Sequence, residues 1–153
     1  MRYSYPLETF QEVPGEISLS ISISGCPLRC KGCHSTETYP VDFGKELTFS
    51  EIDNLLKKYK HSSCILFYGG EWEPSSLIKF ANYIKSKKLK VALYSGYNLS
   101  FFSDSFIENF DFIKTGNYQE KLGGLNSNTT NQKFYKVHLK NNILFNLEEI
   151  KLY

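Results

Sequence analysis

The sequence predicts an α/β protein built on a parallel sheet, and three observations carry this prediction. Short apolar runs alternate with amphipathic segments of helical period between residues 17 and 115. Each of the four predicted strands ends at a glycine, namely Gly25, Gly69, Gly96 and Gly116. A tight group of cysteines follows the first strand directly. Alternating strands and helices are typical of a parallel sheet with crossover helices, whose ligands bind at the carboxyl ends of the strands.

The first predicted strand covers residues 17–24, where aliphatic and serine side chains alternate strictly. A period of two places all the aliphatic side chains on one face and all the serines on the other. In a barrel-like α/β fold we expect the apolar face to pack on helices and the serine face to line the interior.

The middle of the chain predicts two helices and two strands. A helix is expected from Thr48, because Thr48 and Glu51 form a capping-box pattern and an apolar stripe follows. The continuous apolar run 64–68 predicts a buried strand. Residues 75–88 predict the second helix, and residues 90–94 predict the next strand.

The next part of the chain completes the alternation. The phenylalanine-rich residues 99–110 are expected to form a third helix, and residues 111–115 a fourth strand. Gly, Asn, Ser and Thr dominate residues 116–132, which predicts a loop.

A β-hairpin is expected at the C-terminal end. The apolar stretches 134–137 and 143–145 flank the pair Asn141-Asn142, and asparagine tolerates the positive φ of a tight turn. There is no internal repeat or linker, so we expect a single domain of residues 1–153.

Composition excludes several classes of function. The 153 residues are 41% hydrophobic, enough for a sizeable core, and the formal net charge of +2 argues against a nucleic-acid partner. No apolar run approaches the roughly 18 residues that a membrane span needs. The start, Met1 to Pro6, has no apolar signal segment. We therefore expect a cytoplasmic protein with neither a membrane nor a nucleic-acid partner.

Three cysteines, Cys26, Cys30 and Cys33, have the spacing C-x3-C-x2-C. A close cysteine group in a cytosolic protein favours metal binding over disulfides. A 4Fe–4S cluster normally takes four thiolates, so three leave one iron open, and an open metal position indicates reactivity. The distant Cys64 is interpreted as a buried small hydrophobe.

The iron without a cysteine ligand is expected to bind a small chelating molecule with hard donors, such as an amino group beside a carboxylate. S-adenosylmethionine carries this pair, and its sulfonium would then lie near the cluster. One electron from a reduced cluster can break a carbon–sulfur bond there and release a 5′-deoxyadenosyl radical.

Two other interpretations of the cysteines remain. Zinc prefers four ligands. Its fourth ligand here would come from one of four residues: His34, His61, Cys64 or His138. A redox C-x-x-C pair made of Cys30 and Cys33 would leave Cys26 unexplained.

The cysteine motif after the first strand and Gly69-Gly70-Glu71 after the second resemble the radical S-adenosylmethionine superfamily. Within it, the chain is similar to the anaerobic ribonucleoside-triphosphate reductase activating proteins in length and in four segments: Ser24-Gly25-Cys26, Gly32-Cys33, Ser95-Gly96-Tyr97 and Thr129-Thr130-Asn131-Gln132. The chain departs from these activators at His34 and Ser35, where they usually have Tyr and Asn, and at Glu71, where they have Asp.

This resemblance implies a fold and a set of site residues. The fold would be an incomplete β/α barrel of the radical S-adenosylmethionine type with a C-terminal hairpin. The cluster ligands would be Cys26, Cys30 and Cys33. The amino group of S-adenosylmethionine would be bordered by Gly69, Gly70 and Glu71, and its adenine end by the backbone around Gly32, Cys33 and His34.

The resemblance also implies an activity and partners. The product radical would abstract hydrogen from a glycine Cα in the large subunit of an anaerobic ribonucleotide reductase, and an electron donor such as flavodoxin would reduce the cluster. Two alternatives stay open: a radical S-adenosylmethionine enzyme acting on a small molecule or peptide, and a zinc or iron–sulfur binding module without catalysis.

Overall fold

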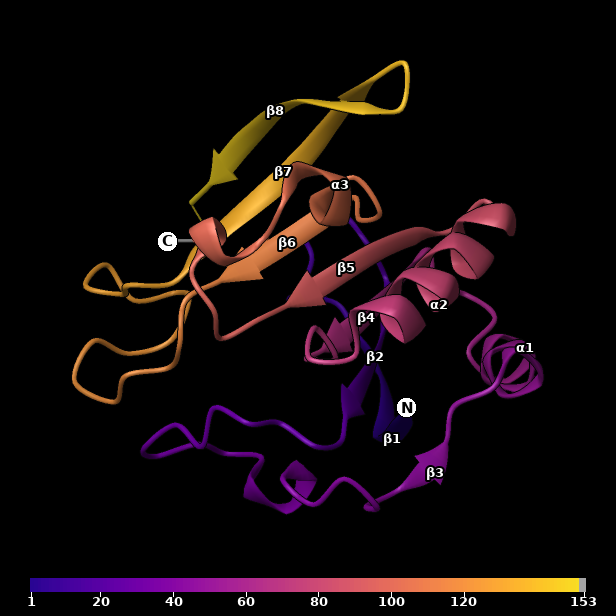
Figure 1. Cartoon of the computed structure of the whole chain (residues 1–153), viewed down its shortest axis with the longest axis horizontal. Coiled ribbons are helices and arrows are strands. Elements are labelled where there is room, and N and C mark those ends of the chain that lie inside the picture. Colours follow the sequence, from indigo (N-terminus) through magenta and orange to yellow (C-terminus); the bar gives the residue numbers. More distant parts are fainter. Residues whose placement is uncertain (152–153) are drawn as a thin grey trace.

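A computed structural model describes residues 1–151, so the last two residues of the predicted domain, 152 and 153, lie outside the described residues. Eight strands form one sheet in the order β3-β1-β2-β4-β5-β6-β7-β8 (Figure 1). The strands are β1 (Arg2–Thr9), β2 (Ser18–Ile23), β3 (Lys45–Glu46), β4 (Cys64–Tyr68), β5 (Lys90–Tyr94), β6 (Phe112–Thr115), β7 (Lys133–Lys140) and β8 (Ile143–Ile150). The helices are α1 (Phe49–Lys58), α2 (Pro74–Ser86) and α3 (Asp104–Ile107), with 3₁₀ turns η1 (Thr36–Thr38) and η2 (Leu99–Phe101).

The centre of the sheet is parallel, as the alternation predicts. Strands β2, β4, β5 and β6 pair in parallel as successive neighbours, while β1, β3, β7 and β8 extend the sheet in antiparallel pairs at its two ends. The four strands predicted from residue 17 to residue 115 are therefore confirmed. Their carboxyl ends meet at one edge, where the loop after β2 and the loop after β6 both lie (Figure 1).

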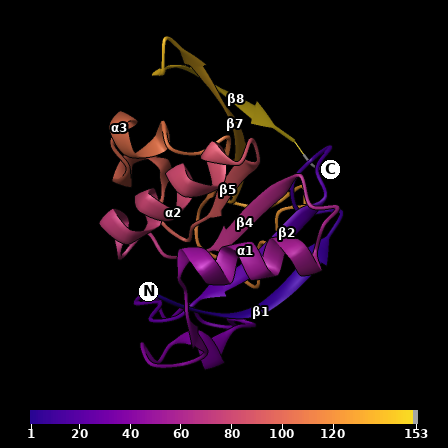
Figure 2. The same cartoon turned by 90° about the vertical axis from the view of Figure 1, so that its right-hand side faces the viewer.

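The two faces of the sheet are covered differently. The aliphatic face of β2 packs with α1, α2 and α3 in the main core, and the three helices lie on that face (Figure 2). The other face holds a smaller apolar cluster in which Cys64 and Val13 are fully buried. The serine side of β2 also faces away from the helices: Ser20 Oγ donates to the carbonyl of Leu7, and Ser22 lines a cavity.

The predicted start of α1 is confirmed. The backbone N–H of Glu51 donates to Thr48 Oγ1 at 3.1 Å, which satisfies one of the free donors at the helix N-terminus. Ile52 and Leu55 on the predicted apolar stripe are buried against the sheet. None of the helices among residues 1–151 has the length and apolarity needed to cross a membrane.

The single helix predicted over residues 99–110 is wrong. The structure has the short turn η2, a break at Phe102 with φ −100° and ψ 138°, and then the four-residue helix α3. Ser103 causes the break, because its hydroxyl accepts the N–H of Phe106 and starts a new helix. The phenylalanine periodicity reflects packing instead: Phe102 stacks on Phe106 with ring centroids 5.1 Å apart.

Strand β1 has no counterpart among the predicted elements. Pro6 lies in its middle, which argues against a strand in a sequence pattern. The structure accommodates Pro6 with a bulge between Ser4 and Leu7, where Tyr5 takes a φ of 52°.

The C-terminal hairpin has the predicted turn. Strands β7 and β8 pair in antiparallel fashion around Asn141 and Asn142, whose φ angles are 54° and 64°. The loop predicted over residues 116–132 contains one isolated bridge, between Gln119 and Gly123. The sheet is open, since β3 and β8 end the strand order of the described residues, and the incomplete barrel stays a prediction.

Alkaline pH is expected to destabilise the fold through Cys64. Burial raises the pKa of this thiol from 9.0 to about 12. The folded state therefore keeps a proton that the unfolded chain loses, so stability present below pH 9 is lost between pH 9 and about 12. The stability of Cys64→Ala should fall less steeply with pH, although the raised pKa values of the partly buried Tyr68 and Tyr94 keep some pH dependence. Denaturant unfolding at neutral pH and at about pH 10 measures both slopes, and equal slopes would remove Cys64 as a cause.

Candidate functional site

The cysteine loop begins where β2 ends, at the carboxyl edge of the parallel strands. Gly25 makes the turn with a φ of 91°, which favours glycine, and its N–H donates to the carbonyl of Thr38 at 2.7 Å. Leu28 packs so closely on Gly96, which follows β5, that a Cβ there would lie 2.4 Å from Leu28 Cδ1. Two of the strand-end glycines therefore bring the cysteine loop close to the sheet.

The three predicted cluster ligands line one cavity of about 140 Å³ at this edge. Other lining residues are Ser22, Gly69, Glu71, Trp72, Tyr94 and Gly96. No three His, Cys, Asp or Glu side chains within residues 1–151 converge on a single metal ion. Thiolates of a 4Fe–4S cluster each bind a different iron, so thiols spaced around a cavity suit a cluster better than one ion.

Local contacts hold the cysteine loop in a tight turn. The N–H of Cys33 donates to the carbonyl of Cys30 at 3.2 Å, and Cys33 Sγ accepts the N–H of Ser35 at 3.4 Å. The guanidinium of Arg29 lies 4.5 Å from the ring centroid of Tyr39. Burial raises the pKa of Cys26, and the charges of Glu71, Cys30 and Cys33 raise it further. Iron binding must therefore displace a thiol proton at this position.

Glu71 is buried in the same cavity, with 4% of its surface exposed. The hydroxyl of Ser95 donates to Glu71 Oε1, whereas Oε2 is buried and has no partner among the described residues. Burial raises the pKa of Glu71, and the Ser95 hydrogen bond opposes that shift. A buried carboxylate oxygen without a partner is costly, so the cavity suits a cationic ligand that donates to it.

Gly69 and Gly70 carry Glu71 into the cavity, as expected for the turn after β4. Their φ angles are 82° and 105°, in the region that favours glycine. A Cβ on Gly69 would lie 2.4 Å from the ring of Trp72, whose Nε1 donates to the carbonyl of Ser24 at 3.2 Å. This tryptophan ties the turn after β4 to the end of β2.

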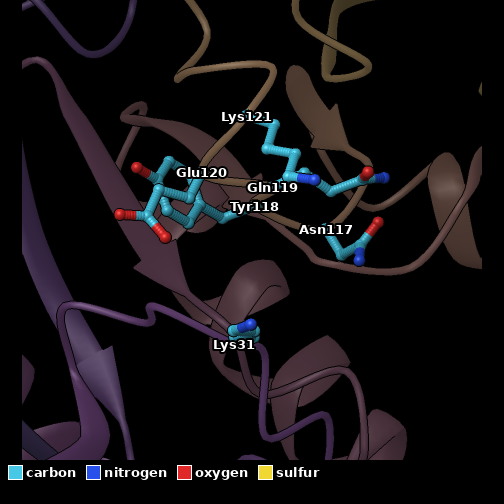
Figure 3. Close-up of a pocket in the computed structure, with 6 residues that line it drawn as sticks. All are labelled: Lys31, Asn117, Tyr118, Gln119, Glu120 and Lys121. Carbon is cyan, nitrogen blue, oxygen red and sulfur yellow. The ribbon is translucent and has the colours of Figure 1, made fainter.

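Gly32 and His34 lie on a different side of the loop. Both are exposed, and the His34 ring lies 5.4 Å from that of Tyr118, a tilted contact. A neighbouring cavity of about 490 Å³ is lined on one side by Lys31 and on the other by residues 117–121 (Figure 3). Only Cys33 of the expected adenine-end residues lines the thiol cavity, while Gly32 and His34 lie beside Tyr118.

The Asn131-Gln132 pair holds the end of β6. Asn131 Nδ2 donates to the carbonyl of Asn117 at 3.0 Å, and Gln132 Nε2 donates to that of Gly116 at 3.3 Å. The loop that faces Gly32 is thereby fixed to the sheet.

Lys114 is a site residue that the sequence interpretation missed. It is 8% exposed in β6 and lines a cavity of about 570 Å³ that shares Tyr68, Tyr94 and Gly96 with the thiol cavity. The signal available in the sequence was a lysine within an otherwise apolar strand ending at a predicted ligand edge.

The proposed fourth ligands for zinc lie away from the thiols, apart from His34. Cys64 is fully buried in the second apolar cluster at the opposite, amino end of β4. His61 is exposed just before that strand. His138 is on β7, where its Nε2 lies 2.7 Å from Glu148 Oε2. The described residues thus offer no converging zinc site.

Comparison with known proteins agrees with a cluster. Residues 14–138 match the family described as 4Fe-4S single cluster domain. Over 87 residues the chain is 32% identical to the pyruvate formate-lyase-activating enzyme of Clostridium pasteurianum, an alignment covering 52% of this chain and 36% of that protein. The chain thus spans little more than a third of that relative's length. No solved structure matches the chain.

Proposed function

The chain belongs to the family of 4Fe-4S single cluster domains, and from this premise we propose that it is a radical S-adenosylmethionine enzyme that activates an anaerobic ribonucleotide reductase by forming its glycyl radical. The observation that carries the proposal is the unpartnered, buried oxygen of Glu71 in the cavity that three thiols line. A thiol-bound cluster alone does not need this carboxylate. A ligand whose amino group can donate a hydrogen bond to the carboxylate does.

The residues present fit the implied cofactors. Cys26, Cys30 and Cys33 would hold the cluster, and Glu71 would accept a hydrogen bond from the amino group of S-adenosylmethionine. The cluster and this ligand together supply one-electron cleavage of a carbon–sulfur bond and a 5′-deoxyadenosyl radical.

The chain's own residues position the ligand and exclude water. Ser95 holds Glu71 Oε1 through its hydroxyl, which leaves Oε2 directed at the ligand. Trp72 packs over Gly69 and contributes to the enclosure of the cavity. Cys33, His34 and Tyr118 would border the adenine end, and the rings of His34 and Tyr118 provide an aromatic surface for a purine.

Two observations support an anaerobic ribonucleotide reductase as the partner. The relative from Clostridium pasteurianum is by its name an activating enzyme of pyruvate formate-lyase, so the chain is similar to an enzyme that activates another enzyme. The segment Thr129 to Gln132 resembles the reductase activators, and it holds the loop beside the site. An incomplete barrel suits a protein substrate, because a loop of the partner must reach the site from the open side.

The proposal is tested with anaerobically reconstituted protein, reduced by flavodoxin or dithionite and mixed with S-adenosylmethionine. We expect 5′-deoxyadenosine by chromatography, and a glycyl doublet in electron paramagnetic resonance when the large subunit of an anaerobic ribonucleotide reductase is added. Pyruvate formate-lyase is the comparison partner. A doublet on pyruvate formate-lyase alone would reassign the target, and no cleavage of S-adenosylmethionine would overturn the activity itself.

A further inference from the structure

Tyr39, at the end of the turn η1, presents its hydroxyl to the cysteine loop. Its side chain lines the cavity of about 140 Å³ that also holds the three predicted cluster ligands. The hydroxyl lies 3.5 Å from the carbonyl oxygen of Cys30, which is too long for a strong hydrogen bond. The phenolic proton is therefore free to be shared with a better acceptor in the same cavity.

The sulfur of Cys33 is such an acceptor. A hydrogen bond between the two side chains is the largest cause that raises the pKa of Tyr39 to about 12, ahead of burial and of the charges of the cysteines. The phenol therefore keeps its proton at neutral pH and stays a donor. Cys33 Sγ also accepts the N–H of Ser35 at 3.4 Å, so a backbone donor and a side-chain donor converge on one sulfur.

Backbone hydrogen bonds hold Tyr39 in this position. The carbonyl of the buried Thr38 accepts the N–H of Gly25 at 2.7 Å, which ties η1 to the start of the cysteine loop. Thr38 Oγ1 donates to the carbonyl of Ser35 at 2.8 Å, and the N–H of Tyr39 donates to the carbonyl of Thr36 at 3.2 Å. The hydroxyl is thus preorganised, since most of the backbone freedom of this segment is already lost.

Arg29 strengthens the phenol as a donor. Its guanidinium lies 4.5 Å from the ring centroid of Tyr39, within the range of a cation–π interaction. A cation over the ring draws electron density away from the hydroxyl, which makes the phenolic proton a better donor. Arg29 is exposed, so its direct charge on the cavity is screened by water and salt, and its main effect passes through the ring.

We propose that Tyr39, with Arg29 over its ring, donates a hydrogen bond to the Cys33 thiolate of the cluster and thereby raises the reduction potential of the cluster. Hydrogen bonds to the sulfurs are among the properties that set this potential. Reduction adds one negative charge, supplied by the electron donor, so a hydrogen-bond donor stabilises the reduced state more than the oxidised one. Tyr39 keeps its proton throughout. The inference rests on the cluster of the proposed function and is independent of the partner enzyme.

The alternative is a structural role, in which the ring of Tyr39 only packs on the cysteine loop and on Arg29. Tyr39→Phe separates the two roles, because phenylalanine keeps the ring and the contact with the guanidinium and removes the hydroxyl alone. A structural role predicts the wild-type potential in this variant.

The test is an anaerobic redox titration of reconstituted protein without S-adenosylmethionine, followed by the electron paramagnetic resonance signal of the reduced cluster. In Tyr39→Phe we expect the ratio of reduced to oxidised cluster at a fixed potential to fall about tenfold, the effect of one hydrogen bond to a charged group. For a one-electron couple this is a shift of about 59 mV to more negative values. Arg29→Gln keeps the hydroxyl and should give a smaller shift in the same direction. Iron per protein should stay at the wild-type value in both variants.

Tyr83→Phe is the matched control. Tyr83 has the same two contacts as Tyr39, since the ammonium of Lys87 lies 4.4 Å from its ring centroid and its hydroxyl donates to Asp53 at 2.8 Å. It lies on α2 and does not line the thiol cavity. Its substitution should therefore leave the potential unchanged.

An unchanged potential in Tyr39→Phe, or an equal shift in Tyr83→Phe, would overturn the inference. Should Tyr39→Phe retain no cluster, Arg29→Gln decides: a shift to more negative potential supports the inference, and the wild-type potential overturns it. Wild-type protein without a reducible 4Fe–4S cluster would overturn the proposed function together with this role of Tyr39. A cluster that titrates as expected but does not cleave S-adenosylmethionine would overturn the proposed function alone and support the role of Tyr39.

Discussion

Replacing any one of Cys26, Cys30 and Cys33 with alanine is expected to abolish both iron retention and cleavage of S-adenosylmethionine. The three thiols line the same cavity, and the described residues offer no nearby cysteine to replace a lost one. A cluster held by two thiolates lacks the ligands that fix it. The measurements are iron per protein, the cluster absorbance and the yield of 5′-deoxyadenosine, all in anaerobic preparations.

Cys64→Ala is the matched control for these three substitutions. Cys64 is fully buried in the second apolar cluster at the amino end of β4, away from the thiol cavity, so its loss should leave iron content and cleavage unchanged while reducing stability. Iron loss in Cys64→Ala, or full activity in any of the three loop variants, would contradict the assignment of the ligands.

Glu71→Gln is expected to weaken binding of S-adenosylmethionine about 10- to 100-fold, which is the effect of removing one charged hydrogen bond in a buried site. Glutamine has the same shape and can still accept from Ser95, so the cavity should keep its form. Iron content should stay at the wild-type value, because Glu71 is not a cluster ligand in this account. Equilibrium dialysis measures the affinity, and the cluster absorbance measures the iron centre.

Glu73→Gln provides the comparison, because Glu73 is two residues away and its side chain is 40% exposed, beside the N-terminal ammonium of Met1. Its substitution should leave the affinity unchanged. Wild-type affinity in Glu71→Gln would show that the free oxygen of Glu71 does not bind the ligand, whereas equal losses in both variants would point to a general electrostatic effect.

The local sequence pattern predicted where the cysteine loop and the Gly69-Gly70-Glu71 turn lie relative to the strands. Glycine at strand ends and cysteines directly after a strand depend on backbone geometry and on the period of the strands, which are local properties. The structure accordingly has the cysteine loop after β2 and Gly69-Gly70-Glu71 after β4. The capping pattern at Thr48 is equally local, and its hydrogen bond is present.

The errors come from long-range packing and from single-residue backbone effects. The phenylalanine spacing over residues 99–110 resembled that of one helix. In the structure a new helix begins after Ser103, and the spacing comes from aromatic stacking. The strand β1 was hidden by Pro6, which a bulge accommodates. Lys114 was not recognised as a site residue from sequence, because its position beside Tyr94 depends on the pairing of β5 with β6.

The most direct test of the central claim is electron–nuclear double resonance on the reduced, reconstituted protein with S-adenosylmethionine that carries ¹⁵N at its amino group. The account predicts a nitrogen coupling to the cluster, because the iron without a cysteine ligand binds the amino group, and the coupling should be present in Cys64→Ala. A reduced 4Fe–4S cluster with bound ligand and no ¹⁵N coupling, or zinc in place of iron, would contradict it.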